Sequence, residues 1–167
     1  MTNRAIFNRQ YTDYTPGGQQ VWLVNGAGVA TTPVTTQTYT AGETLIQGQA
    51  VYVSGTYALS ASAASGVNAV KYNPVGITTA SAASSASVSV AVDGVVVLSS
   101  ANLTGETQLT PAEYYYLSRY NGSVTKYATS SGLVTSASGY AALVYLGQAL
   151  SPTELQIEIE PPVVLYD

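Results

Sequence analysis

Two segments of the chain alternate apolar with polar or small side chains at a period of two residues. The apolar positions are Val88, Val90 and Val92 in residues 87–93, and Leu155, Ile157 and Ile159 in residues 154–160. Successive side chains of a β-strand point to opposite faces, so this period predicts half-buried strands rather than helices. A sheet with one apolar face must bury it against another layer, which predicts an all-β fold, a compact β-sandwich or barrel.

The residues that follow the first alternating segment predict a second strand. Val95–Leu98 is continuously apolar, which is typical of a strand covered on both faces. Asp93-Gly94 lies between the two segments and is a frequent sequence in two-residue hairpin turns. We therefore expect a tight hairpin at this point.

Two short segments have the sequence of a helix start. Thr110–Glu113 and Ser151–Glu154 each place a Ser or Thr three residues before a Glu, with a Pro between them. The residues that follow, Tyr114–Leu117 and Leu155–Ile159, favour strands by side-chain type or by period. Each Pro is therefore expected in a turn that leads into a strand, with a single helical turn as the alternative.

The chain repeats an order of features from residue 45 onward. Val51–Ser54 aligns with Tyr115–Ser118, Val75-Gly76 with Leu146-Gly147, and Ser87–Asp93 with Glu154–Glu160. Such self-similarity predicts two similar β units that share one core. We expect a β domain over residues 41–167, with repeats at about 45–98 and 109–160.

Residues 1–40 differ from the rest of the chain. Pro16-Gly17-Gly18 is a strong breaker, Val21–Val24 is a short strand candidate before Asn25-Gly26, and Ala30–Thr40 is rich in Thr. This composition predicts an extended N-terminal arm, and an ordinary edge strand of the main domain is the alternative.

Two tracts, Ser60–Gly66 and Thr79–Ser87, are rich in Ala and Ser. Loops or edge strands with small side chains are the simpler interpretation. Close packing against a neighbouring subunit is the functional one.

Charged residues make up only 8% of the chain, against about 25% in typical domains, whereas hydrophobic residues make up 46%. The surface must therefore consist largely of uncharged side chains. Such a surface lets subunits pack closely without burying unpaired charge, and so indicates assembly.

The same composition excludes several classes of protein. The net charge is −4 with five Lys and Arg, which form no basic cluster, so we expect no nucleic-acid partner. The absence of Cys excludes a disulfide scaffold. Residues 1–10 lack the apolar core of a signal peptide, and the longest apolar run, Tyr140–Leu146, is far shorter than the ~20 residues of a membrane helix. We expect synthesis in a cytoplasm and no membrane partner.

We expect no catalytic, cofactor-binding or metal site. Without His and Cys, the most common general bases and zinc ligands are missing. Glu154, Glu158 and Glu160 fall on one strand face at roughly 7 Å spacing, which overlaps that of inverting glycosidases. A solvated outer face accounts for the same pattern, so we expect a protein that is not an enzyme.

Tyrosine is over-represented, with 14 residues against one Phe and one Trp. A ring with a polar tip suits half-buried strand faces and subunit interfaces. The tyrosines that cluster in the second unit are Tyr114, Tyr115, Tyr116, Tyr120 and Tyr127. They are interpreted as cross-strand packing, as an oligomer interface or as a sugar-binding platform, and the low charge favours the interface over the sugar.

Several short motifs together resemble a known family. They are Gly48–Ser54, Pro74–Thr79, Gly94–Val96, Leu109–Ser118 and Leu146–Ser151. Over about residues 42–160 the chain is similar to the capsid decoration, or cement, proteins of tailed phages, and to modules in phage tail fibres. The first 40 residues are longer and richer in Tyr and Pro than that family leads us to expect.

The resemblance implies a structural virion protein, assembled in the host cytoplasm. It would bind the outside of the phage head, often as a homotrimer, and stabilise contacts between major capsid proteins, with no catalytic residues. The expected interface comprises Arg4, Ile6, Phe7, Tyr11, Tyr14 and Trp22 with Tyr114, Tyr115, Tyr116 and Tyr120. The arm would reach an adjacent subunit by strand addition. The alternative is a tail-fibre or receptor-binding module that recognises host surface glycans.

Overall fold

The computed structural model describes residues 23–24, 30–31, 33–64, 66–126 and 140–165. The chain divides into two units, residues 1–33 and 34–167. In the first unit, β1 (Leu23–Val24) pairs with β2 (Ala30–Thr31) in antiparallel orientation. Apart from two 3₁₀ turns, η1 (Ala69–Tyr72) and η2 (Ser100–Asn102), the regular elements of the described residues are strands. The all-β prediction is confirmed.

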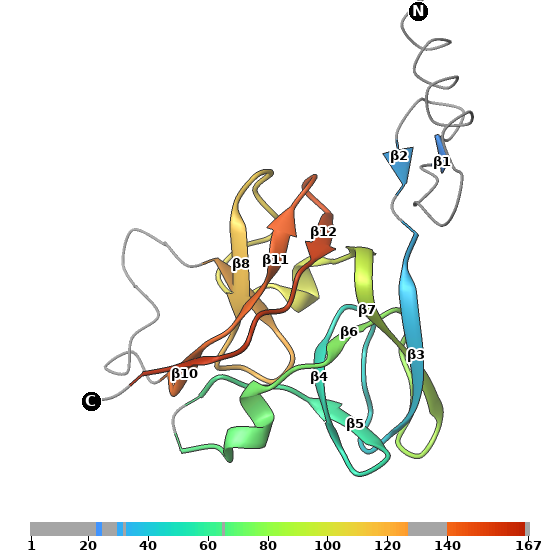
Figure 1. Ribbon diagram of the computed structural model, residues 1–167, viewed down its shortest axis with the longest axis vertical. Helices are drawn as coiled ribbons and strands as arrows, with labels where there is room; N and C mark the ends of the chain where they lie inside the picture. The colour runs from blue at the N-terminus through green and yellow to red at the C-terminus, as the bar shows by residue number, and fades with distance from the viewer. Residues whose placement is uncertain (1–22, 25–29, 32, 65, 127–139, 166–167) are drawn as a thin grey trace, which may run out of the picture. The chain divides into compact units, whose positions relative to one another are not determined.

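Five strands of the second unit close into a ring (Figure 1). They are β3 (Thr35–Ala41), β4 (Ala50–Ser54), β5 (Tyr57–Ser60), β6 (Gly76–Thr78) and β7 (Ser87–Val97). Their order is β3-β5-β4-β6-β7, and β7 pairs back onto β3. The ring is therefore a small barrel, antiparallel except for the parallel pair β3–β5.

The C-terminal half of β7 begins a second set of paired strands. The set continues through β12 (Glu154–Ile157), β11 (Tyr145–Ala149), β8 (Tyr114–Leu117) and β9 (Val124–Lys126). A parallel bridge between Leu103 and Val124 joins β9 to the chain that follows β7. A separate ribbon pairs β10 (Ala142–Leu143) with β13 (Val163–Val164).

The order of strand pairs is the same in both halves. The pairs β4–β5, β4–β6 and β6–β7 of the first half correspond to β8–β9, β8–β11 and β11–β12 of the second. Gly76 pairs with Val51, and Gly147 pairs with Tyr115. The sequence alignment placed these two glycines on each other, as it did Val51 and Tyr115. The two halves therefore share an order of strand pairs.

The hairpin expected at Asp93-Gly94 is wrong, because β7 continues through it as one strand. Gly94 has a φ of 100°, and its N–H donates to the Asp93 carboxylate over 2.8 Å. Residues before this point pair with β3 and β6, whereas Gly94 and the residues after it pair with β12. The left-handed residue thus redirects the strand from one set to the other.

The alternation predicted for β7 holds only in part. Val88 and Val90 are buried as expected, but Ala91 is also buried and Val92 is only half-buried. Val92 is the extra residue of a bulge opposite β3, since Asp93 pairs with Thr35 and Ala91 with Thr36. The prediction that both faces of Val95–Leu98 are covered is also wrong, since Val97 is 56% exposed.

Both Pro-containing turns lead into strands, as predicted. Glu113 N–H donates to the Thr110 carbonyl over 3.2 Å, and β8 starts at the next residue. Glu154, the first residue of β12, donates its N–H to the Ser151 hydroxyl over 3.1 Å. No α-helix occurs within the described ranges.

Replacing Ala112 with Gly is expected to stabilise the domain by about 0.5–1 kcal/mol. Ala112 follows Pro111 in this turn and has a φ of 67°, where an L side chain costs roughly 1–2 kcal/mol and Gly costs little. The larger conformational entropy of unfolded Gly offsets part of that gain. Urea denaturation measures the change, and a lower midpoint would contradict the assignment of strain.

The boundary of the N-terminal region differs from the prediction. The division lies at Pro33, and Thr35–Ala41 is β3 of the first barrel, paired with both β5 and β7. Residues 35–38 are exposed, so their polarity does not prevent a strand, and β-branched Thr favours one. Of the arm expected over residues 1–40, residues 1–22, 25–29 and 32 lie outside the described residues.

The core lies in two clusters. The smaller one fills the first barrel, with Leu45, Val51, Val88 and Val90 among its members. The larger one contains Leu117, Leu146 and Leu155 of the second half and also residues of the first half such as Tyr52 and Ile77. The two halves therefore share the larger cluster.

The tract Ser60–Gly66, expected as a loop or edge, contributes to that shared cluster. Ala61, Ser62 and Ala63 are buried. Ala63 N–H donates to the Ser118 carbonyl over 3.0 Å, and the Ser62 hydroxyl donates to the Arg119 carbonyl over 2.8 Å. The small side chains allow close packing as proposed, but against the second half of the same chain.

Candidate functional site

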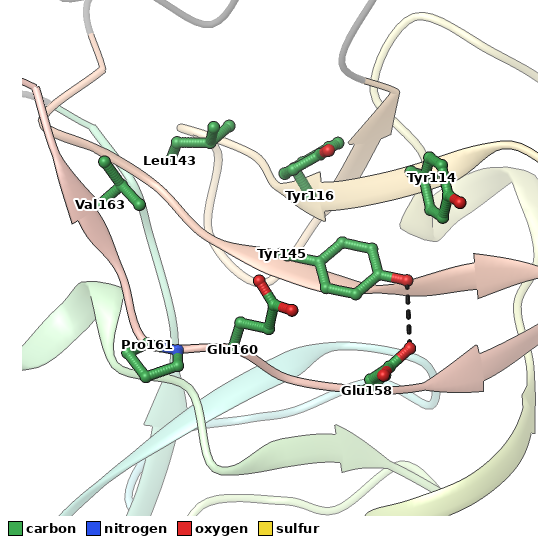
Figure 2. A pocket seen from close by; sticks show the side chains of 8 residues that line it. All are labelled: Tyr114, Tyr116, Leu143, Tyr145, Glu158, Glu160, Pro161 and Val163. Atoms are coloured by element: carbon green, nitrogen blue, oxygen red, sulfur yellow. Dashed lines mark hydrogen bonds between the residues drawn. The ribbon is translucent and has the colours of Figure 1, made fainter.

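A groove of about 370 Å³ opens on the second half of the domain (Figure 2). It is lined by Tyr114, Tyr116, Leu143, Tyr145, Glu158, Glu160, Pro161 and Val163. Figure 2 shows Tyr145 between the tyrosines of β8 and the two glutamates. The groove thus combines aromatic rings, carboxylates and an apolar end.

The period of β8 places its tyrosines. Tyr115 and Leu117 point into the core, so Tyr114 and Tyr116 share the opposite face. On the neighbouring strand, Tyr145 pairs directly with Tyr116. Side chains of directly paired residues lie close together, which brings the third ring to the same surface.

The ring of Tyr145 contacts the rings of Tyr114 and Tyr116. The centroids of Tyr114 and Tyr145 are 5.8 Å apart at an interplanar angle of 69°. Those of Tyr116 and Tyr145 are 5.7 Å apart at 58°. Such tilted arrangements are the favourable ones for aromatic pairs, so they hold Tyr145 in place.

The tyrosine at the centre has a carboxylate at its hydroxyl. Tyr145 Oη donates to Oε2 of Glu158 over 3.5 Å, a long hydrogen bond. Burial raises the pKa of Tyr145 to about 12, with a further contribution from the negative charge of Glu158. The Tyr145 hydroxyl is therefore protonated at neutral pH, and the groove is a region of negative potential.

Tyr145 is expected to lose its proton at a pH of about 12, above the usual tyrosine pKa of about 10. The pKa of Tyr145 is higher in the folded than in the unfolded chain. The stability that Tyr145 contributes is therefore present below pH 10 and is lost as the pH rises towards 12. Tyrosinate absorbance of the wild type minus that of Tyr145→Phe isolates the transition. Glu158→Gln should lower the pKa, and a difference curve centred at pH 10 would contradict the described environment.

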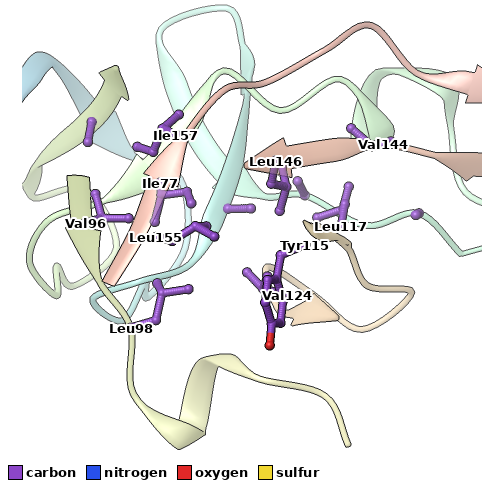
Figure 3. Packing of buried hydrophobic residues seen from close by; sticks show 14 of the residues in the cluster. Ile77, Val96, Leu98, Tyr115, Leu117, Val124, Val144, Leu146, Leu155 and Ile157 are labelled. Carbon is purple, nitrogen blue, oxygen red and sulfur yellow. The ribbon is translucent and has the colours of Figure 1, made fainter. Parts of the chain in front are cut away.

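Tyr115, expected at an interface, lies instead in the core of its own domain (Figure 3). Only 1% of its surface is exposed. Its hydroxyl donates to Glu106 over 2.9 Å and accepts from the Thr110 N–H over 2.8 Å. Because the pleat turns every second residue inward, consecutive tyrosines cannot all face a partner, and the prediction for Tyr115 is wrong.

The other predicted interface residues have different locations. Tyr114 and Tyr116 line the groove, whereas Tyr120 does not. Tyr120 is 52% exposed, and the Arg119 guanidinium lies 5.1 Å from its ring centroid. The structure does not describe the side chains of Arg4, Ile6, Phe7, Tyr11, Tyr14 and Trp22, so their role stays a prediction.

The three glutamates considered for catalysis are not all at the groove. Glu158 and Glu160 line it, while Glu154 starts β12 and does not. All three are exposed. Within the described part of the chain the recorded salt bridge joins Lys126 to Glu113 at 3.6 Å, so neither groove carboxylate is in an ion pair there.

Four groove residues were not singled out from the sequence: Leu143, Tyr145, Pro161 and Val163. Tyr145 lies between the buried Val144 and Leu146, so the alternation of side chains turns it outward. It reaches the groove through the pairing of β11 with β8, and Val163 does so through the pairing of β13 with β10. Neither pairing has a local sequence signal.

The described residues contain no group of three or more Asp or Glu side chains placed to hold a metal ion. A second hollow, of about 540 Å³, is lined by Gly105–Gln108 and Thr110.

The helical segments of the described residues are too short to cross a membrane.

No family model matches the chain, and no curated protein matches it.

Proposed function

We propose that this chain is a structural virion protein that decorates the outside of a tailed-phage head. Its partners in this proposal are the major capsid protein and further copies of itself, as a homotrimer. The observation that carries the proposal is the surface of residues 34–167, which exposes large apolar side chains among few charges.

Among the described residues, the exposed large apolar side chains are Val34, Ile46, Tyr57, Val70, Val97, Tyr114, Tyr120, Leu150, Val163 and Val164. Single exposed apolar residues are normal on soluble proteins. Here they occur in a chain with only 8% charged residues. Depletion of charge, with tyrosine present, is the composition of interface centres, and it supports a role in assembly.

The fold supports the same role. The first barrel closes on itself through β3–β7, so its strands offer few free edges for uncontrolled pairing with other chains. Contacts with a shell would then use side chains of the closed unit together with residues 1–33, which form a unit of their own. A closed domain with a separate N-terminal segment suits a protein that is attached to a larger surface.

Deleting residues 2–20 tests the contribution of that segment. Particles lacking the chain are mixed with wild-type or truncated protein, and occupancy is measured after sedimentation. We expect a large loss of occupancy, with the thermal unfolding of the truncated chain unchanged because its core lies within residues 34–167. Unchanged occupancy would exclude the segment from particle binding.

The groove favours a second candidate function, a tail-fibre module that binds host glycans. The tyrosine rings of the groove can stack on a sugar, and the carboxylates of Glu158 and Glu160 can accept hydrogen bonds from its hydroxyl groups. A glycan-binding screen of the wild type and of Tyr145→Ala tests it. A decoration protein would bind none of the glycans, whereas binding lost in the variant would favour the tail-fibre function.

A further inference from the structure

The two units of the chain carry opposite charge. Residues 1–33 hold Arg4, Arg9 and Asp13 as their charged side chains, a net charge of +1. Residues 34–167 hold three Lys or Arg and eight Asp or Glu, a net charge of −5. Two of the five cations in the chain therefore lie within its first nine residues.

The groove is suited to a cation. The faces of tyrosine rings attract guanidinium and ammonium groups, and three such rings line this groove. Glu158 and Glu160 add two carboxylates that are in no ion pair within the described residues. Leu143 and Val163 at the other end offer apolar contact for the stem of a long basic side chain or for a neighbouring apolar residue.

We propose that the groove binds the N-terminal segment of a second copy of this chain, through Arg4 or Arg9. The guanidinium would lie against the ring of Tyr145 and pair with Glu158 or Glu160. Ile6 and Phe7, between the two arginines, would contact the apolar end of the groove. The inference rests on the self-association in the proposed function and names the surface that would produce it.

The length of the segment allows such an exchange. Residues 9–34 can span up to about 80 Å when extended, which exceeds the width of a small domain. The domain begins at β3 of the first barrel, whereas the groove is built by strands of the second half (Figure 1). An exchanged segment that repeats around a symmetry axis would close a ring of copies, as in a trimer.

The charge of the groove distinguishes this occupant from a neutral sugar. Burying the two carboxylates under an uncharged ligand would remove water from them without supplying an opposite charge. An arginine supplies that charge and can bind a carboxylate through two parallel hydrogen bonds. Charge complementarity therefore favours the arginine.

Charge exchange in the full-length chain tests the inference. Sedimentation equilibrium at low salt compares the wild type with R4E/R9E, with E158K/E160K and with the chain that carries all four changes. Either pair alone should raise the dissociation constant roughly a hundredfold. The fourfold variant should regain most of the wild-type affinity, because its segment and groove again have opposite charge.

E154K is the matched control, since Glu154 is an exposed glutamate of β12 that does not line the groove. It should leave association unchanged, and circular dichroism should show that each variant is folded. Association that persists in both reversed pairs would overturn the inference while leaving the proposed self-association intact. A chain that is monomeric at all concentrations would overturn both the inference and the proposed self-association. A neutral glycan bound at Tyr145 without any effect of Arg4 and Arg9 would also overturn it.

Discussion

Gly147→Ala is expected to destabilise the domain by about 3 kcal/mol, which would lower its unfolding midpoint more than most single substitutions do. A Cβ at Gly147 would overlap the carbonyl oxygen of Gln156 and lie 2.9 Å from its carbonyl carbon. These atoms belong to the backbone of β12, which pairs with both β11 and β7. Neither strand can therefore move away without losing hydrogen bonds.

The equivalent glycine of the first half should behave in the same way. A Cβ at Gly76 would overlap the carbonyl oxygen of Ala91 and lie 2.6 Å from Cγ1 of Val90. Both glycines thus lie where a short strand approaches the next strand of its unit too closely for any side chain. The repeat keeps Gly at this place for a steric reason.

Gly105→Ala is the control for these two substitutions. Gly105 has a φ of 84°, but a Cβ there would meet no atom within 4 Å. Its substitution should cost only the backbone strain, about 1–2 kcal/mol. Urea denaturation of the three variants separates steric overlap from strain. A cost for Gly147→Ala no larger than that for Gly105→Ala would contradict the described close approach.

Asn102→Ala is the second substitution with a large expected effect, about 3 kcal/mol. Asn102 is 2% exposed. Its amide donates to the Gln47 carbonyl over 2.7 Å, and its Oδ1 accepts from the Ser99 N–H over 2.9 Å and from the Ser99 hydroxyl over 3.0 Å. Gln47 belongs to the first half and Ser99 to the segment after β7, so one side chain joins the two. Its removal breaks three part-buried hydrogen bonds, each worth about 0.5–1.5 kcal/mol.

The matched control for this substitution is Asn68→Ala. Asn68 is exposed, and its Oδ1 accepts a single hydrogen bond of 3.3 Å from the Val70 N–H at the start of η1. Water can replace that bond, so we expect a loss of about 0.5–1 kcal/mol. Differential scanning calorimetry gives both values. Equal losses for the two variants would show that Asn102 does not link Gln47 to the segment after β7.

The sequence predicted the class of fold because alternation depends only on local residues. Leu155 and Ile157 are in the core, as their period indicates. The alignment of Gly76 with Gly147 also predicted two positions that the strand pairing makes equivalent. However, that alignment placed Ala91 on Glu158, whereas the pairings place it on Gln156, since Ile77 pairs with Ala91 and Gln148 with Gln156.

The errors came from features that depend on non-local pairing. Asp93-Gly94 suits both a hairpin turn and a bend within a strand, and only the partners β3 and β12 decide between them. The extra residue at Val92 has no sequence signal either, because a bulge is defined by the opposite strand.

The candidate groove could be predicted only in part. Period 2 places Tyr114 and Tyr116 on one face and Tyr115 on the other, but it does not say which face is buried. Tyr145 lies on β11 and Glu158 directly follows β12, and they reach these tyrosines through the pairings β8–β11 and β11–β12. A local pattern cannot specify which strands become neighbours.

Locating the chain on intact virions tests the central claim most directly. On our proposal a tailed phage encodes the chain, and electron cryomicroscopy of the particles of that phage, with and without the gene, would give a difference map. We predict density on the outer surface of the head, in clusters of three copies in contact with the major capsid protein. Density confined to the tail, or particles from which the chain is absent, would contradict the account.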